Sequence, residues 1–195
     1  MSPLRLLSTA ECDELRVRNL PADLATLLVA ESPPKRGFFY LASDSKSRGL
    51  FYETMKAVYG DGFCKMWDNT PSSSMSELRN GYICRFKTDG YYLADASKRV
   101  LSGMEFEEKL NYLKSEEVRT SLLSQMQNLI PEESRKHTRV ILISKSVFAA
   151  YSDILEEPYC VLNTCSIPFP RFEWQKKVFQ ERLSKLLVNR VPQDL

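Results

Sequence analysis

Hydrophobic positions in the first fifty residues fall into two short runs behind a helical segment. Residues 24–31 form a Leu- and Val-rich run of strand length that ends at Ser32-Pro33-Pro34, where two consecutive prolines predict a turn. Residues 38–41 have the composition of a second strand, so the pattern predicts a hairpin. Upstream, Ser8 and Glu11 have the spacing of a capping box, which predicts a short helix over residues 9–18.

Helical periodicity begins after residue 47. Apolar side chains recur there at i, i+4, i+7 and i+8, and Gly60-Asp61-Gly62 predicts the end of that helix. Two further helices are predicted within residues 102–131, the second ending at Pro131. A last helix is expected after Pro170, with apolar residues on one side and charged residues on the other.

The remaining apolar runs predict strands. Residues 81–86 and 91–96 flank Asp89-Gly90, a strong hairpin signal, and residues 138–143 and 159–162 are further strand candidates. The polar stretch 68–75 is predicted to be a loop between substructures. The predicted order is hairpin, helix, hairpin, helical insert, strands and a final helix.

Composition narrows the possible chemistry. The chain has 195 residues and one histidine, His137, which excludes any mechanism that needs two His ligands or an HExxH pair. Lys and Arg total 27 against 25 Asp and Glu, a net charge of +2 that is too balanced to predict strong non-specific nucleic-acid binding. No metal or other cofactor is predicted.

The cysteines and the apolar runs suggest where the protein resides. Five cysteines without a CxxC pair suit reduced thiols. No apolar run reaches the roughly 18 residues of a membrane span, and residues 1–7 lack the apolar core of a secretory signal. We therefore expect a cytoplasmic protein with no membrane partner.

The order of elements resembles an extended Tudor domain, in which a Tudor barrel is inserted into a staphylococcal-nuclease-like OB fold. The residues that carry the resemblance are Val29-Ala-Glu-Ser-Pro33 with Phe38-Phe-Tyr40, then Gly81-Tyr-Ile-Cys-Arg-Phe86 and Asp89-Gly-Tyr-Tyr-Leu-Ala94. The resemblance implies an α+β, mainly β fold: a Tudor barrel plus an OB fold with a helical insertion. Residues 1–75 and 155–195 would form the OB-like half, and residues 76–154 the barrel with its insert 102–131.

The resemblance also implies a peptide-binding cage. Family members hold methylated arginine between aromatic rings and an Asn, because a methylated guanidinium gains from π faces. The candidate positions of a degenerate cage in this chain are Phe86, Tyr92, Leu142, Lys145, Val147 and Phe148. Ser144-Lys-Ser-Val147 replaces the family's Asp-Tyr-Gly-Asn, and Lys145 would repel a cationic ligand. Methylarginine recognition is therefore predicted to be lost or very weak.

These residues favour one function, leave one alternative open and disfavour catalysis. The favoured function is a non-catalytic scaffold that binds a short peptide of a protein partner, which the resemblance places in piRNA-type small-RNA processing, in cytoplasm or perinuclear granules, with RNA reached indirectly through a complex. The alternative is single-stranded RNA binding through the OB-like half, using basic pairs such as Lys35-Arg36 and Lys176-Lys177. Catalysis is disfavoured because no nucleophile motif or carboxylate cluster is found, so no small-molecule substrate is expected.

Overall fold

A single parallel sheet organises the molecule in the computed structural model, which describes residues 7–35 and 37–188. Its strands lie in the order β2-β1-β3-β4, and every pairing is parallel. Their bounds are β1 Thr26–Ala30, β2 Tyr91–Asp95, β3 Arg139–Leu142 and β4 Cys160–Val161.

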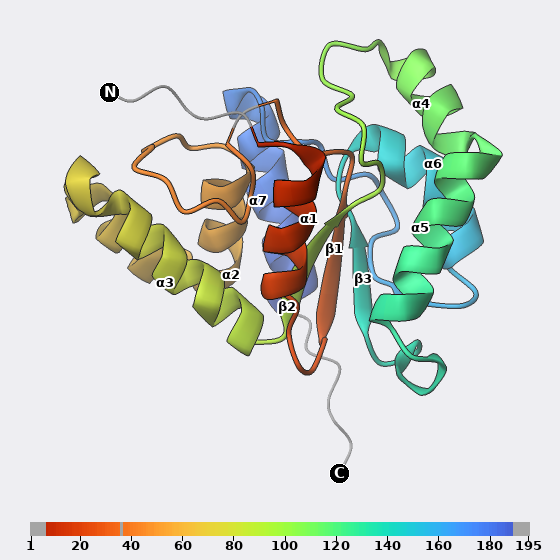
Figure 1. Cartoon of the computed structure of the whole chain (residues 1–195), viewed down its shortest axis with the longest axis horizontal. Coiled ribbons are helices and arrows are strands. Elements are labelled where there is room, and N and C mark those ends of the chain that lie inside the picture. The colour runs from red at the N-terminus through yellow and green to blue at the C-terminus, as the bar shows by residue number, and fades with distance from the viewer. Residues whose placement is uncertain (1–6, 36, 189–195) are drawn as a thin grey trace.

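Helices cover both faces of this sheet. Figure 1 shows α2, α3 and α7 on one side and α4, α5 and α6 on the other. The helices are α1 Thr9–Arg18, α2 Leu50–Asn69, α3 Met75–Thr88, α4 Phe106–Lys114, α5 Glu116–Leu129, α6 Lys145–Leu155 and α7 Glu173–Val188, with short 3-10 turns at Ser72–Ser74 and Glu132–Ser134. The architecture is a doubly wound α/β sandwich.

The central strand shows why the sheet is parallel and buried. All five residues of β1, from Thr26 to Ala30, are buried. A strand covered by helices on both faces is apolar without alternation, whereas a strand with one wet face alternates. The continuous run 24–31 is therefore the sequence of an inner strand and not of a hairpin arm.

The mainly β fold predicted from the resemblance is wrong. The chain contains neither a Tudor barrel nor an OB barrel in its described residues: helices predominate, and the strands form one open parallel sheet. That sheet takes β1 from the segment assigned to the OB-like half and β2 and β3 from the segment assigned to the barrel.

The first reason for this error is the segment 81–86, which lies within α3. Met75, Ile83 and Phe86 are buried at helical spacing, and Gly81 and Arg85 are exposed. Asp89-Gly90 then joins a helix to β2 and closes no hairpin. Gly90 has φ +76°, and a Cβ on it would lie 2.8 Å from the carbonyl oxygen of Asp23, so the turn requires glycine.

The second reason is the segment 38–41, which is a buried loop. The hydroxyl of Tyr40 accepts a hydrogen bond from the Leu93 N–H (2.7 Å) and donates one to the Leu93 carbonyl (3.1 Å). One side chain thus satisfies the backbone of Leu93 at the outer edge of β2, and residues 38–41 do not form the strand that was predicted to pair with residues 24–31. Full burial raises the pKa of this phenol well above its usual value.

Several local predictions are confirmed. The capping box is present, with Ser8 Oγ accepting from the Glu11 N–H at 3.2 Å, and α1 spans the predicted residues. The insert 102–131 holds α4 and α5. Gly60 does not end α2 but kinks it, at φ 64° and ψ −150°, and the helix continues to Asn69. Helix α6 was not predicted.

Candidate functional site: a crevice at the carboxyl ends of β1 and β3

The topology marks one edge of the sheet as the place for a ligand. The chain leaves β1 for α2 and α3 on one face, and leaves β3 for α6 on the other face. Where connections diverge from neighbouring parallel strands, a crevice opens outside their carboxyl ends, and doubly wound proteins bind ligands there. A crevice of about 720 Å³ lies at this point, between the segments that follow β1 and β3 and the start of α7.

Glu31, the residue that follows β1, is held by two partners. Its Oε1 lies 2.8 Å from the Lys109 ammonium of α4, and its Oε2 accepts a hydrogen bond from the Ser146 hydroxyl of α6. Both ionic side chains are mostly buried. Glu31 therefore ties the end of β1 to α4 and α6, which cover the same face of the sheet, and its charge is neutralised.

The segment after β3 is shaped by Ser144. This residue has φ +93°, and its hydroxyl accepts from the Val147 N–H (3.1 Å) and lies 3.0 Å from the Ser146 hydroxyl. Ser144 is thus the N-cap of α6 and turns the chain sharply from strand to helix. The helix consequently begins with Lys145 at the crevice.

Asn163 anchors the opposite wall. Its side-chain oxygen accepts from the Leu142 N–H (2.9 Å), and its amide donates to the carbonyls of Leu142 and Cys165, both at 3.1 Å. The amide replaces the backbone of β4, which ends at Val161. The chain is thereby free to turn toward α7, whose first residues line the crevice.

The crevice is strongly basic. Five of its lining side chains are basic (Lys35, Lys109, Lys145, Arg171, Arg182), and Glu31 is the only acidic one. Lys109 pairs with Glu31, and the other four cations have no carboxylate partner among the described residues. Of these, Arg182 donates to the Ser166 carbonyl and the Lys145 ammonium lies 4.5 Å from the centre of the Phe106 ring. Four like charges at one opening raise the local concentration of anions despite the balanced charge of the whole chain.

Two aromatic rings stand exposed at this opening. Phe172 is 58% exposed and Trp174 is 65% exposed, whereas the other tryptophan, Trp67, is buried. Both exposed rings line the crevice. A ring that contributes no core packing but sits beside cations is a suitable platform for stacking on a ligand. Ser102 also lines the crevice. Its hydroxyl oxygen is buried and has no hydrogen-bond partner among the described residues.

The six predicted cage residues do not form one surface. Tyr92 on β2 and Leu142 on β3 pair with opposite edges of β1, so a whole strand separates them. Phe86, Tyr92, Leu142 and Val147 are buried in the core, and Phe148 is half-buried on α6. Only Lys145 lies at the crevice.

The basic pairs predicted to bind RNA are also scattered. Lys35 lines the crevice, Arg36 lies outside the described residues, and the Lys176 ammonium is paired with Glu173 and does not line the crevice. Arg171 and Arg182, which do line it, were not among the predicted residues. The sequence did contain a signal for this site. A short polar segment follows each of two continuous apolar runs: Ser32-Pro-Pro34 follows residues 24–31, and Ser144-Lys-Ser146 follows residues 138–143.

Other features of the described residues place further limits on the site. No group of three or more His, Cys, Asp and Glu side chains that could hold a metal occurs in residues 7–35 and 37–188. None of the helices in those ranges is both long enough and apolar enough to cross a bilayer.

Comparisons with known proteins add no family: no family model matches the chain, and no curated protein or solved structure matches it either.

Proposed function

We propose that the protein binds a single-stranded nucleic acid, with the crevice at the carboxyl ends of β1 and β3 as its site. The observation that carries the proposal is that four cations without a carboxylate partner among the described residues and two exposed aromatic rings line the same crevice. This crevice lies where the connections after β1 and β3 leave the sheet on opposite faces. Cations follow a phosphate backbone, and exposed rings stack on unpaired bases. The proposed RNA ligand is the alternative considered from the sequence, now located in a different fold.

The test is a fluorescence-anisotropy titration of the full chain with labelled 12-nucleotide RNA and DNA strands. Three to four phosphate contacts predict that log Kobs falls with log salt at a slope of about −2 to −3. Lys145→Ala and Arg171→Ala should each make the slope shallower by about 0.7. Absence of binding at low salt would overturn the proposal.

A matched control separates the crevice from general surface charge. Lys185 lies on α7 outside the crevice and is paired with Glu181 at 2.9 Å, so Lys185→Ala should leave affinity nearly unchanged. Equal losses in Lys185→Ala and Arg171→Ala would place binding elsewhere on the molecule.

Stacking has its own readout because Trp174 is exposed and Trp67 is buried. Bound strands should quench Trp174 fluorescence, and Trp174→Ala should weaken binding about 5- to 100-fold, the range for one stacked base. Quenching that persists in Trp174→Phe would rule out this ring as the platform.

The peptide-binding scaffold predicted from the sequence is a second candidate, supported by a different surface. A groove of about 690 Å³ runs between α1 and α5, and Val17 is 74% exposed at its side. An apolar side chain this exposed suits an apolar anchor of a partner peptide. The absence of catalysis and the piRNA-type context remain predictions.

Selection of displayed peptides against the full chain tests this candidate. Selected peptides should lose binding to Val17→Asp and keep it with Lys185→Ala, and methylation of their arginines should not change affinity. Tighter binding of dimethylarginine forms would contradict the predicted independence from methylation.

A further inference from the structure

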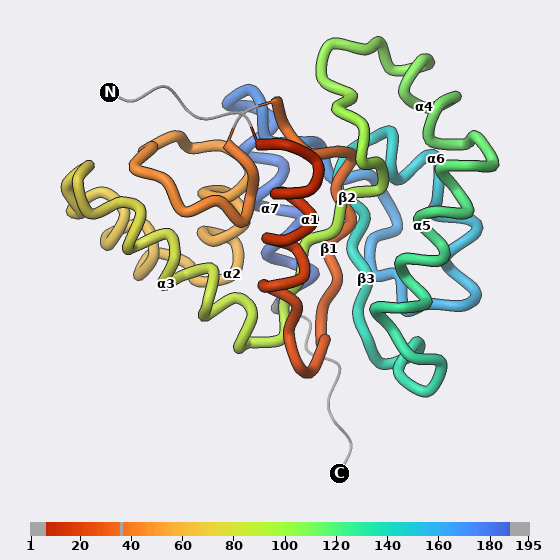
Figure 2. Tube along the Cα trace, in the orientation of Figure 1, coloured from red at the N-terminus to blue at the C-terminus, as the bar shows by residue number. Residues whose placement is uncertain are grey.

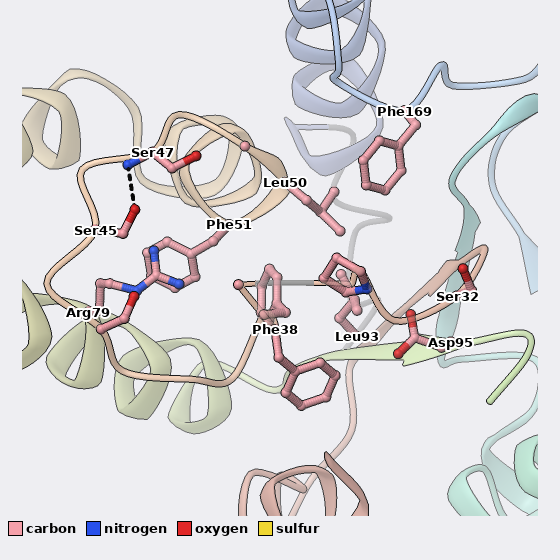
Figure 3. A pocket seen from close by; sticks show the side chains of 15 residues that line it. Ser32, Phe38, Ser45, Ser47, Leu50, Phe51, Arg79, Leu93, Asp95 and Phe169 are labelled. Carbon is pink, nitrogen blue, oxygen red and sulfur yellow. Dashed lines mark hydrogen bonds between the residues drawn. The ribbon is translucent and has the colours of Figure 1, made fainter. Parts of the chain in front are cut away.

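A smaller cavity lies beside the crevice, on the side of the sheet covered by α2 and α3. It measures about 210 Å³ and shares Ser32, Pro34 and Phe169 with the crevice wall. We call it the Arg79 cavity, after the side chain at one of its ends (Figure 3). Figure 2 shows the long connection between β1 and α2 that encloses it.

Arg79 is a buried cation that has no carboxylate partner in residues 7–35 and 37–188. It is 4% exposed, and its guanidinium lies 4.0 Å from the centre of the Phe51 ring. Among the described residues, its only hydrogen bond joins Nε to the Leu41 carbonyl at 3.3 Å. Burial lowers the pKa of Arg79 to about 10, because the loss of hydration is not offset by an opposite charge.

Hydrogen-bond donors gather at the same end of the cavity. Ser43, Ser45 and Ser47, all on the connection before α2, line it. Ser45 Oγ accepts from the Ser47 N–H at 3.2 Å, which leaves its proton available to another acceptor (Figure 3).

The first turn of α2 adds further donors. Gly49 and Leu50 line the cavity, and the helix starts there without a side-chain cap. Uncapped N–H groups at a helix N-terminus favour an anion. The buried guanidinium and the helix start are independent features, and both require negative charge at one place.

We propose that the Arg79 cavity binds a phosphate group, held by the guanidinium of Arg79, by the serine hydroxyls and by the start of α2. A phosphate is favoured over a carboxylate because its three terminal oxygens can accept from donors that converge from different directions. Phe38, Leu50 and Phe169 form apolar walls of the cavity, which suit the organic part of a phosphate monoester.

One carboxylate lines the cavity, and its position is compatible with an anion. Asp95 lies at the end opposite Arg79 (Figure 3), and its Oδ2 is 2.6 Å from the Arg16 guanidinium. Its charge is therefore compensated on the far side.

The test is thermal unfolding of the full chain with inorganic phosphate, and separately with phenyl phosphate, against chloride at equal ionic strength. At about ten times its Kd, phosphate should raise Tm by about 3 to 6 °C. The shift should disappear in Ser43→Ala/Ser47→Ala and shrink in Arg79→Lys, which keeps the charge but loses the fork. Arg48→Ala, an exposed neighbour paired with Asp68, should keep it.

No phosphate-specific shift, or a shift equal in all variants, would overturn the proposal. Strands with a 5′-phosphate and a 5′-hydroxyl distinguish the source of the phosphate. Tighter binding of the 5′-phosphorylated strand would show that the cavity takes the phosphate at a strand end. A rise in Tm with phenyl phosphate, without tighter binding of the phosphorylated strand, would show that it takes a free phosphate monoester. The inference goes beyond nucleic-acid binding: a 5′-hydroxyl strand that fails to bind refutes the proposed function and leaves the phosphate shift unaffected.

Discussion

Two arginines are buried among the described residues, and their surroundings differ. Arg16 on α1 is 7% exposed and meets Asp95 at 2.6 Å and Asp13 at 2.7 Å. Burial acts to lower the pKa of Arg16, but the two carboxylates outweigh it and the pKa is raised. Arg79 on α3 has no carboxylate partner among the described residues, and its pKa is lowered.

The difference distinguishes a structural charge from one that awaits a ligand. Arg16 joins α1 to the end of β2, and its counter-ion belongs to the fold. Arg79 lines a cavity that has space for a counter-ion. No carboxylate of the described residues fills that role. A buried charge is costly unless paired, so the second arrangement is suited to binding an anion.

Removing Arg16 should give the largest effect. Arg16→Met leaves Asp95 buried beside an apolar side chain, and breaking a buried pair from one side typically costs about 3 to 5 kcal/mol. Urea unfolding followed by circular dichroism measures the change. A loss below about 1 kcal/mol would show that this pair is not the tie we infer.

Removing Arg79 should not lower the free energy of unfolding in buffer without phosphate, in contrast to removing Arg16. Arg79→Met keeps an apolar contact with Phe51 and relieves an uncompensated charge, although it gives up the bond to Leu41. We expect the free energy of unfolding to stay the same or to rise by up to about 2 kcal/mol. A fall as large as that of Arg16→Met would contradict the comparison.

Alkaline pH offers a second view of Arg79. Burial lowers its pKa to about 10 in the folded protein, below the ordinary value of an arginine, so the unfolded chain holds its proton more tightly. The destabilisation by the buried charge is complete below pH 10 and is relieved as pH rises above 10 towards the pKa of the unfolded chain. The advantage of Arg79→Met in urea unfolding should therefore be constant between pH 7 and 9 and smaller at pH 10.5.

Glu53 provides the smallest test, on a buried carboxylate. Burial raises its pKa above 4.5, and its carboxylate oxygen accepts from the Gln180 amide at 2.7 Å. The folded state holds this proton more tightly, so the destabilisation grows as pH rises through the unfolded pKa and is complete above the folded pKa. Glu53→Gln keeps an acceptor for Gln180 and should add about 1 kcal/mol at pH 7. That gain should vanish below pH 4.5, and a loss at pH 7 would refute the reasoning.

Local elements were predictable where the signal was itself local. The Ser8 capping box and the periodic segment within residues 102–131 predicted helices that the structure contains. The apolar runs 24–31, 91–96, 138–143 and 159–162 contain β1 to β4. Each of these signals depends on residues within a few positions of one another.

Ambiguous short runs produced the errors. Residues 81–86 contain aromatic and β-branched side chains, yet their neighbours Met75 and Arg79 extend a helical stripe. A short apolar run is compatible with both the helical period of 3.6 residues and the strand period of 2 residues, and only a longer window of sequence decides between them. Helix α6 escaped prediction because it follows β3 directly, with only Ile143 and Ser144 between them.

By itself, the sequence determined most of the elements and the burial of β1. The reason is that hydrophobic periodicity, helix caps and apolar runs depend on residues only a few positions apart. Only the tertiary structure decided that the strands pair in parallel across distances such as that from Leu27 to Tyr92. The same pairing separates the predicted cage residues and brings Lys145, Arg171 and Trp174 to one crevice. The physical reason is that strand order and side-chain convergence arise from packing of distant segments, to which local propensity contributes little.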